Sequence, residues 1–408
     1  MDDTLKIVIV GMVDHGKSTF TGRLLYDTGS LPDAKLEEIK KASQELGKEI
    51  EFAFLIDHLQ EEREQEMTID TAQIFFRTNK RRYVIIDAPG HVEFIKNMIT
   101  GAAQADAAVL IVDASRGVEV QTKRHAVILG MLGIKDVIVV INKMDLEHYN
   151  KQKFEKIKKD VLQFLSGISI VPMHVIPISA KKGDFVAEYT ETMPWYEGPS
   201  VLDALDMIEK QKDDEEKPLA YPVQDIYYFG ERLLAGRVES GKIAQGDEIV
   251  VLPQNKKTSI SAIKVFEGEK KEAKAGECIT VTLKDLFQIE RGNIIAHEAE
   301  RPFVTNTFHA TLFWMTGSFK KGDQLILRCS TQEMPCKIDN IAARYESSTM
   351  EVLQQDAEEL KETEVGEVLI QTDTPLCVTH FTDIPELGRF VIVKNNEVVA
   401  GGIVTKAF

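Results

Sequence analysis

The sequence predicts an α/β domain, with a mostly parallel sheet and helices on both faces, followed by two small antiparallel β-barrels. Two observations predict this order. Over residues 1–215, apolar runs of strand length alternate with amphipathic stretches, which is typical of a parallel sheet. After the polar, linker-like stretch 209–217, short β-rich runs separated by glycine turns are typical of small barrels. The expected domains are therefore 1–215, 219–301 and 302–408.

The elements of the first domain are expected in a regular order. Strands are predicted at the apolar runs 6–10, 73–77, 83–87, 107–113, 137–142 and 174–178. Helices are predicted near 18–27, 92–104, 119–132, 151–166 and 200–211. Because ligands of such sheets bind beyond the carboxyl ends of the strands, we expect the functional site at that edge.

The barrels are expected to consist of short strands, at 234–238, 248–252, 259–266, 277–282, 308–314, 324–329, 367–372 and 390–393. The last hairpin is expected to turn at Asn395 and Asn396. One string in this region imitates a phosphate-binding loop, because residues 236–242 fit the pattern G-x-x-x-x-G-K. Ile243 follows where Ser or Thr is needed, so we interpret Ser240-Gly241 as a hairpin turn.

A complete phosphate-binding loop stands between the first strand and the first helix, at Gly11–Ser18. Gly11 and Gly16 allow the backbone N–H groups to cradle a β-phosphate, and Lys17 supplies a charge to the β/γ oxygens. The Ser18 hydroxyl can bind Mg²⁺, and the helix N-terminus adds its dipole. The residues predicted to contact the nucleotide here are Gly11, Val13, Asp14, His15, Gly16, Lys17, Ser18 and Thr19.

Two further strand ends indicate that the base is guanine. In Asn142-Lys143-Met144-Asp145, the Asp145 carboxylate can accept both the N1–H and the 2-amino donors, a pair that adenine lacks. Asn142 would bond the N7/O6 edge or the neighbouring loops, and the Lys143 stem would cover the ring. The segment Ser179-Ala180-Lys181 would supply a backbone N–H to guanine O6.

Residues between these motifs predict sensing and hydrolysis of a γ-phosphate. Asp87 can hold the metal through water, the Gly90 N–H can bond the γ-phosphate, and His91 can orient the attacking water. The alternative for His91 is a histidine at a helix start without chemistry. Thr68 is the candidate switch threonine because of its position among the other motifs; a single threonine would not indicate this role. The predicted catalytic residues are Lys17, Thr68 and His91, the predicted metal ligands are Ser18, Thr68 and Asp87, and the expected cofactors are GTP or GDP and Mg²⁺.

Composition narrows the classes of partner and compartment. The net charge of −16 argues against a broad nucleic-acid surface, and we interpret the basic triplet 80–82 as a solvated turn. No apolar run approaches the ~20 residues of a membrane helix, and the N-terminus shows no signal-peptide pattern. Four cysteines without a C-x-x-C pair indicate neither a zinc site nor a disulfide framework. We therefore expect a cytoplasmic protein without a membrane or nucleic-acid partner.

Together these motifs resemble those of the translation-factor GTPases, which include elongation factors Tu and 1-alpha. The shared set is Gly11–Ser18, Thr68, Asp87–His91, Asn142–Asp145 and Ser179–Lys181. Within that group the chain looks like the GTPase (large) subunit of sulfate adenylyltransferase, in segments 24–29, 58–60, 121–125, 193–199 and 290–293. The likeness covers essentially the whole chain and implies a P-loop GTPase domain followed by two barrels. Glu66 departs from it, standing where the switch pattern usually has Gly.

The resemblance implies that GTP hydrolysis drives the joining of sulfate to the AMP of ATP, which gives adenylylsulfate and pyrophosphate. The sequence has no S-G-G-x-D-S loop and no H-x-x-H pair. We therefore expect a catalytic small subunit of the ATP-pyrophosphatase type in a heteromeric complex, with an adenylylsulfate kinase as a further candidate partner. The alternative is an elongation-factor-like carrier of aminoacyl-tRNA. His15 and residues 87–94 favour the carrier, whereas segments 58–60, 193–199 and 364–368 favour the sulfate subunit.

Overall fold

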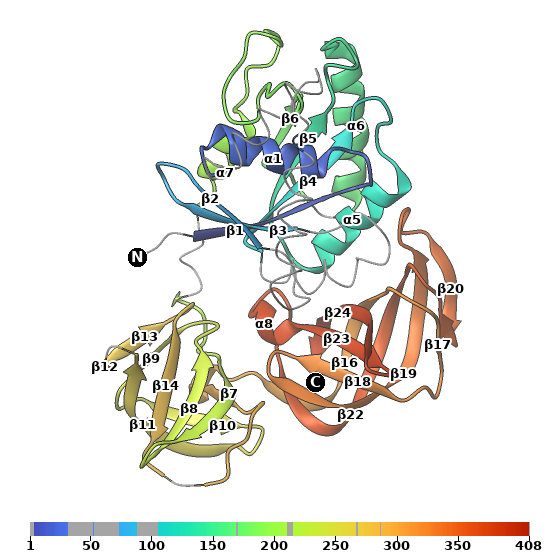
Figure 1. The fold of residues 1–408 in the computed structure, drawn as a ribbon. Coiled ribbons are helices and arrows are strands. Elements are labelled where there is room, and N and C mark those ends of the chain that lie inside the picture. The colour runs from blue at the N-terminus through green and yellow to red at the C-terminus, as the bar shows by residue number, and fades with distance from the viewer. Residues whose placement is uncertain are drawn as a thin grey trace. The chain divides into compact units, whose positions relative to one another are not determined.

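The chain folds into two compact units, residues 1–210 and 211–408 (Figure 1). The computed structural model describes residues 4–31, 52, 73–87, 105–168, 170–209, 215–266, 268–285 and 287–407. The first unit contains a mostly parallel sheet with helices, and the second contains two closed antiparallel barrels. The fold class expected from the sequence is confirmed. The limits 1–215, 219–301 and 302–408 for the domains remain our proposal.

The sheet of the first unit has the strand order β2-β3-β1-β4-β5-β6. All neighbours are parallel except β2, which runs antiparallel to β3. Every residue of β4 is buried, as its unbroken apolar sequence predicts for a strand covered on both faces. The strands are β1 (Thr4–Gly11), β2 (Gln73–Arg77), β3 (Arg82–Asp87), β4 (Ala107–Asp113), β5 (Asp136–Asn142) and β6 (His174–Pro177).

Four described helices pack against this sheet: α1 (Lys17–Asp27), α5 (Val120–Met131), α6 (Lys151–Gly167) and α7 (Val201–Asp206). In α6, Phe154, Ile157, Val161 and Leu165 form one buried stripe, and the Asn150 side chain caps the first turn. The helix expected at 200–211 is shorter than predicted, because the chain leaves the helix after Asp206. The helix expected at 92–104 lies outside the described residues.

The end of α7 also corrects, in part, the interpretation of the basic triplet 80–82. Arg81 is 8% exposed, and its guanidinium donates to the Ile208 carbonyl oxygen. Thr78 and Tyr83 donate to the carboxylate of Asp206. Of the triplet, Arg81 alone is buried, whereas Lys80 and Arg82 are exposed at the turn between β2 and β3, as expected. Lys80 and Arg81 also anchor the end of α7, because they donate to the carbonyl oxygens of Asp206 and Ile208.

The first barrel closes through the pairing of β10 with β11. Among the described residues of this barrel, its core contains fifteen buried ones, including Tyr221 and Ile263. Gly236 lies on β8 and Gly241, with φ of 72°, lies in the bend before β9, so no helix follows and the string is not a phosphate-binding loop. The expected hairpin is wrong, because β8 pairs with β7 and β14 whereas β9 pairs with β13 in another sheet. The strands are β7 (Tyr221–Tyr228), β8 (Arg232–Arg237), β9 (Lys242–Ala244), β10 (Glu248–Leu252), β11 (Lys256–Val265), β12 (Gly268–Lys270), β13 (Glu272–Lys274), β14 (Cys278–Leu283) and β15 (Ile294–Ala296), followed by a 3₁₀ turn, Glu298–Glu300.

The second barrel closes through β18 and β19 around a core that includes Trp314 and Phe308. Its last hairpin turns at Asn395 and Asn396, whose φ values of 53° and 65° fit a type I′ turn, as expected from the sequence. The elements are β16 (Phe303–Trp314), β17 (Phe319–Lys320), β18 (Leu325–Cys329), β19 (Gln332–Glu346), β20 (Val352–Ala357), β21 (Glu359–Leu360), β22 (Glu364–Val378), α8 (Pro385–Gly388), β23 (Arg389–Lys394) and β24 (Glu397–Ala407).

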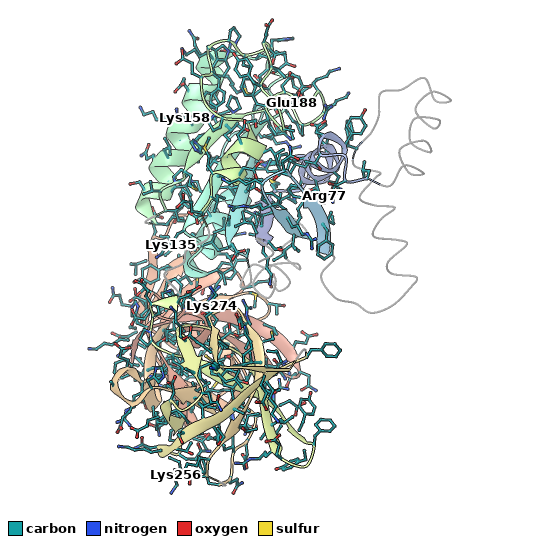
Figure 2. All side chains as sticks on the ribbon, turned by 90° about the vertical axis from the view of Figure 1, so that its left-hand side faces the viewer. Arg77, Lys135, Lys158, Glu188, Lys256 and Lys274 are labelled. Atoms are coloured by element: carbon teal, nitrogen blue, oxygen red, sulfur yellow. The ribbon has the colours of Figure 1, made fainter. Side chains whose placement is uncertain are left out.

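Charged side chains cover the outside of both units, as Lys135, Glu188 and Lys256 illustrate in Figure 2. Within the described ranges, no helix is both long enough and apolar enough to cross a membrane. The parallel sheet instead brings functional groups together at one edge. Its register aligns Ile9 with Asp87 and Asp113 with Asn142, so the motifs that follow these strands meet beyond their carboxyl ends.

Candidate functional site

The loop between β1 and α1 has the shape that the phosphate-binding motif predicts. Gly16 precedes the helix with φ of 88°, a left-handed conformation that favours glycine. A Cβ atom at Gly16 would lie 2.5 Å from Asn142 Nδ2, and one at Gly11 would lie 2.6 Å from the Ile111 carbonyl oxygen. Both glycines are therefore required by close contacts with neighbouring strands. The first turn of α1 contains no acidic residue, which leaves its N–H groups suited to an anion.

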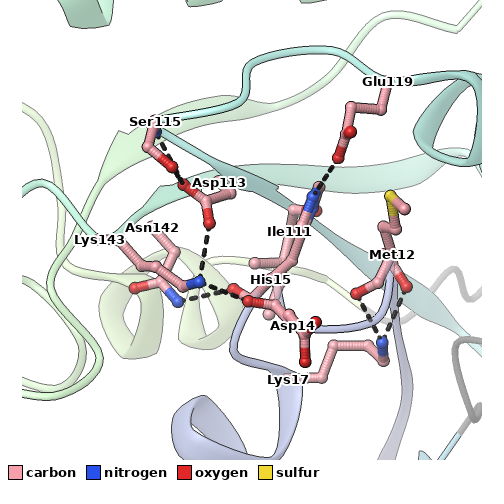
Figure 3. A network of polar contacts seen from close by, with 11 residues as sticks. Met12, Asp14, His15, Lys17, Ile111, Asp113, Ser115, Glu119, Asn142 and Lys143 are labelled. Atoms are coloured by element: carbon pink, nitrogen blue, oxygen red, sulfur yellow. Dashed lines mark hydrogen bonds and ion pairs between the residues drawn. The ribbon is translucent and has the colours of Figure 1, made fainter.

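The ammonium group of Lys17 contacts the backbone at the start of the phosphate-binding loop. The Nζ atom donates to the carbonyl oxygens of Gly11 and Met12 at 2.8 and 2.9 Å (Figure 3). Ser18 and Thr19 lie beside it in the first turn of α1, and Val13 and Asp14 are exposed in the loop. The charge predicted to meet the β/γ-phosphates thus lies at the loop itself.

His15 contributes to the loop from the inside. Its ring is fully buried, with Nδ1 3.2 Å from the Ile111 carbonyl oxygen and Nε2 2.9 Å from Glu119 Oε2 (Figure 3). Both ring nitrogens of His15 therefore contact protein groups, which places this side chain in the support of the loop. Behind the loop lies His125, which is 3% exposed; burial, together with the charges of Lys17 and His15, lowers its pKa to about 3.

Asn142 joins three of the predicted motifs through one amide group. Its Nδ2 donates to the His15 carbonyl oxygen at 2.9 Å, and its Oδ1 accepts from the Ala180 N–H at 2.9 Å. The side chain is 2% exposed. Of the two roles expected for Asn142, the structure shows contact with the neighbouring loops. The Ala180 N–H, one candidate donor to guanine O6, is engaged by the same amide.

Lys143 is held by a carboxylate that the sequence analysis did not select. Its Nζ lies 2.7 Å from Asp113 Oδ2 and also donates to the Asp14 carbonyl oxygen (Figure 3). Asp113 is 1% exposed and accepts further bonds from the N–H and Oγ of Ser115. Burial opposes ionisation of Asp113, but the bonds from Lys143 and Ser115 outweigh it and keep the pKa of Asp113 below its usual value. The Lys143 stem is thereby fixed beside the loop.

Asp145, the predicted base-reading residue, is oriented by Ser179. The Ser179 hydroxyl donates to Asp145 Oδ1 at 2.7 Å, and Ser179 is fully buried. Lys182 N in turn donates to the same hydroxyl oxygen at 3.2 Å. The structure therefore brings Asn142, Lys143 and Asp145 together with the segment Ser179–Lys181, as the guanine motifs predict.

The residues predicted to act on the γ-phosphate are described less fully. Thr68, Gly90 and His91 lie outside the described residues, and Asp87 is described only as the backbone end of β3. Of the predicted Mg²⁺ ligands, Ser18 is placed, in the first turn of α1. A serine hydroxyl beside a phosphate site suits Mg²⁺, which usually takes few protein ligands and several phosphate and water oxygens. Among the described side chains, no group of three or more His, Cys, Asp or Glu forms a separate metal centre.

Among the described residues of the site, the sequence analysis missed Asp113, Glu119 and the pair of Tyr149 and Asp184, in which the Tyr149 hydroxyl donates to Asp184 Oδ2 at 2.8 Å. Asp113 carried a usable signal, because it ends an apolar strand as Asp87 and Asn142 do. The other three carried none, because their partners lie 35 or more residues away in the sequence.

The strand–loop–helix and the guanine-type strand ends define a nucleotide-binding α/β protein. The sequence matches the family model of the elongation factor Tu GTP binding domain over residues 2–211. Residues 232–296 match elongation factor Tu domain 2, and residues 307–405 match the GTP-eEF1A C-terminal domain-like family. The chain belongs to the elongation factor Tu family of GTPases.

Relatives in two functional groups are similar to this chain. Elongation factor 1-alpha of Pyrococcus furiosus is 36% identical, over 98% of this chain and 97% of its own length. Sulfate adenylyltransferase subunit 1 of Alteromonas mediterranea is also 36% identical, over 98% of this chain and 87% of its own length. Among solved structures, Sup35 complexed with GMPPNP aligns with 100% of this chain and 95% of its own, at 23% identity and a TM-score of 0.48.

Proposed function

We propose that this chain is the GTP-hydrolysing regulatory subunit of a sulfate adenylyltransferase. GTP hydrolysis here is coupled to the formation of adenylylsulfate and pyrophosphate from ATP and sulfate on a separate catalytic subunit. The proposal is supported by similarity to a protein named sulfate adenylyltransferase subunit 1, a name that implies a partner subunit. The net charge of −16 argues against a broad nucleic-acid surface, although it does not exclude a local one.

The observation that carries the GTP-binding part is the amide of Asn142. It connects the phosphate loop to the base-recognition segment with two bonds of 2.9 Å, so the pieces of a guanine-nucleotide site are held in register. Asp145 then presents a carboxylate to the N1–H and 2-amino groups, and Lys17 presents its ammonium to the β/γ-phosphates. Ser18, Thr68 and Asp87 would hold Mg²⁺, which would neutralise phosphate charge when bound.

Hydrolysis itself is assigned to residues around the γ-phosphate. Gly90 senses the γ-phosphate, His91 orients the attacking water, and Thr68 contacts the metal and the γ-phosphate. His91→Ala should retain GTP binding and slow turnover by roughly 10²-fold or more. Lys17→Ala should instead weaken binding, because the phosphates lose a counter-charge. Equal binding defects in both variants, without a separate rate defect in His91→Ala, would contradict this division of roles.

The regulatory role is tested with the purified chain and its partner. Alone, the chain should hydrolyse GTP slowly and form no adenylylsulfate. With a catalytic subunit of the ATP-pyrophosphatase type, GTP hydrolysis should accelerate, most strongly when ATP and sulfate are both present. No response to the partner, ATP or sulfate would reject the proposal. A cytoplasmic location and an adenylylsulfate kinase as a further partner belong to the same proposal.

The second candidate is an elongation-factor-like carrier of aminoacyl-tRNA. It is favoured by the equal identity to elongation factor 1-alpha, whose length the chain covers almost completely. It is also favoured by His15, whose ring is built into the phosphate loop through Glu119. Tight binding of aminoacyl-tRNA by the GTP form, but not by the GDP form, would establish this role.

A further inference from the structure

The aromatic segment 193–199 has no part in the nucleotide contacts derived above, although it was singled out by its sequence. Its rings pack on buried phenylalanines of the first unit. The Trp195 ring centroid lies 5.3 Å from that of Phe154 on α6, and the Tyr196 centroid lies 5.1 Å from that of Phe185. Phe154 and Phe185 are 1% and 0% exposed. The segment is therefore fixed to the core between α6 and the chain that follows Ser179–Lys181.

The turn that runs from Lys143 to Tyr149 contains backbone conformations that require contacts from other segments. Lys143, His148 and Tyr149 have φ values of 63°, 50° and 55°, and each such left-handed residue other than glycine costs about 1–2 kcal/mol. Conformations of this kind persist where surrounding contacts determine them. The Tyr149 N–H donates to the Met144 carbonyl oxygen at 2.8 Å, which closes the turn locally.

Two contacts of Tyr149 reach beyond the turn. The Tyr149 hydroxyl donates to Asp184 Oδ2 at 2.8 Å, and the Tyr149 carbonyl oxygen accepts from Trp195 Nε1 at 3.0 Å. Burial first, and then Asp184, raises the pKa of Tyr149 well above its usual value, so the hydroxyl stays a donor over the working pH range. Tyr149 thus connects the turn both to Asp184, which follows the segment Ser179–Lys181, and to Trp195 of the aromatic segment.

Asp184 links Tyr149 to Asp145, the residue predicted to read the base. It is 5% exposed, and its Oδ1 accepts from the Thr192 hydroxyl at 3.0 Å. Its backbone carbonyl accepts from the Ser179 N–H at 3.2 Å. The Ser179 hydroxyl then donates to Asp145 Oδ1 at 2.7 Å. The contacts therefore run from Tyr149 to Asp184, from Asp184 to Ser179 and from Ser179 to Asp145. Because Tyr149 follows Asp145 by four residues, the chain itself closes this ring of contacts.

We propose that Tyr149, Asp184 and Trp195 are positioning residues for guanine recognition. They fix the spacing between the turn that carries Asp145 and the segment that carries Ser179. The Asp145 carboxylate is thereby held at the angle at which it can accept the N1–H and the 2-amino donors together. This inference rests on the base-reading role of Asp145, which is part of the proposed function.

A positioning role predicts a specific change in discrimination between bases. Hypoxanthine has the N1–H of guanine but lacks the 2-amino group. A displaced Asp145 loses the second bond first, so GDP should lose more affinity than IDP. A general loss of structural integrity would weaken both nucleotides alike. The ratio of the two affinities therefore separates positioning from mere stabilisation.

The test compares Tyr149 with Tyr196 of the aromatic segment, by calorimetry with GDP and IDP. Tyr149→Phe removes the bond to Asp184 and should lower GDP affinity about 5- to 10-fold, the scale of one hydrogen bond, with a change of less than about twofold for IDP. The matched control is Tyr196→Phe, which removes the bond from Tyr196 to the Pro199 carbonyl oxygen at 3.2 Å. It should leave the ratio unchanged. Trp195→Phe keeps an aromatic ring in contact with Phe154 but removes the Nε1 donor to Tyr149. It should therefore also lower the affinity for GDP relative to that for IDP.

The outcomes distinguish failure of this inference from failure of the base assignment. Equal losses for GDP and IDP in Tyr149→Phe, or no loss, would overturn the positioning role. Asp145→Asn should abolish the preference for GDP over IDP, and Tyr149→Phe should then have no further effect on the ratio in that background. If Asp145→Asn kept the preference, the base-reading role itself would be wrong, and the inference would fail with it.

Discussion

The phosphate side and the base side of the site are built by different means, although both lie on one sheet edge. On the phosphate side, glycine conformation and the close approach of neighbouring strands determine the loop, as at Gly11 and Gly16. On the base side, hydrogen bonds between side chains determine the geometry, as at Asp145 and Ser179. A steric requirement fails abruptly, whereas a hydrogen-bond network loses its members one at a time. Substitutions should therefore have abrupt effects on one side and graded effects on the other.

The largest effect is expected for Gly16→Ala. The left-handed conformation costs about 1–2 kcal/mol for alanine. The new Cβ atom would lie 2.5 Å from Asn142 Nδ2, so Asn142 must move and lose two hydrogen bonds that contribute about 1 kcal/mol each. We expect GDP affinity to fall by about 100-fold or more in calorimetry.

Gly29→Ala is the matched control for this substitution. Gly29 also has a left-handed φ, of 60°, but no atom lies within 4 Å of the position of its Cβ. It should lower the free energy of unfolding by about the backbone cost alone and leave GDP affinity unchanged. Equal losses of affinity in both variants would show that steric contact does not determine the phosphate loop.

A smaller effect is expected for Asp113→Asn, which tests the boundary between the two sides. The substitution keeps the shape of the side chain but removes the charge that holds Lys143 at 2.7 Å. Because a bond to a charged group contributes about 1.5–3 kcal/mol, and Lys143 keeps its bond to the Asp14 carbonyl oxygen, we expect GDP affinity to fall about tenfold. Asp27→Asn, which breaks the pair of Asp27 with Arg23 on α1, should not change affinity. An unchanged affinity in Asp113→Asn would mean that Lys143 needs no fixed anchor.

The last effect concerns His125 behind the phosphate loop, on stability rather than on nucleotide affinity, and it appears only as a dependence on pH. The folded-state pKa of about 3 lies below the unfolded value of about 6.5, so below pH 6.5 the unfolded chain takes up a proton that the folded chain does not. Stability should thus fall with pH, by about 2 kcal/mol between pH 7 and pH 5. His125→Gln should remove this part of the loss.

The measurement is urea unfolding of the nucleotide-free full chain with Trp314→Phe, in which Trp195 is the remaining tryptophan and its fluorescence monitors the first unit. The exposed histidine His148, with φ of 50°, provides the control, because asparagine tolerates this conformation. His148→Asn should keep the pH dependence of the parent chain. If His125→Gln kept it as well, another group would be responsible.

The sequence predicted those parts of the molecule that follow from local patterns. Buried strands such as β4 and β5 are continuous apolar runs, and residues at their ends meet because parallel strands share an edge. The Asn395-Asn396 turn was predicted because few residues tolerate two left-handed positions in succession. The short strands β9, β12 and β13 were not predicted, because three residues are too few to show the alternation of apolar and polar side chains that indicates a strand.

Pairings between distant polar side chains could not be predicted. Nothing near Tyr149 in the sequence indicates Asp184, and nothing near Arg81 indicates the Ile208 carbonyl oxygen. Each of these contacts depends on how two loops approach in the folded sheet, which one sequence does not encode as a pattern. The roles of Thr68, Gly90 and His91 remain predictions.

The two bonds of the Asn142 amide also have a consequence for the order in which the protein matures. They span 127 residues back to His15 and 38 residues forward to Ala180. Contacts of such long range form late, after the intervening chain has been ordered. A growing chain therefore cannot complete its nucleotide site until the segment beyond β6 has left the ribosome. Nucleotide capture then reports that the chain has been assembled at least as far as Ala180.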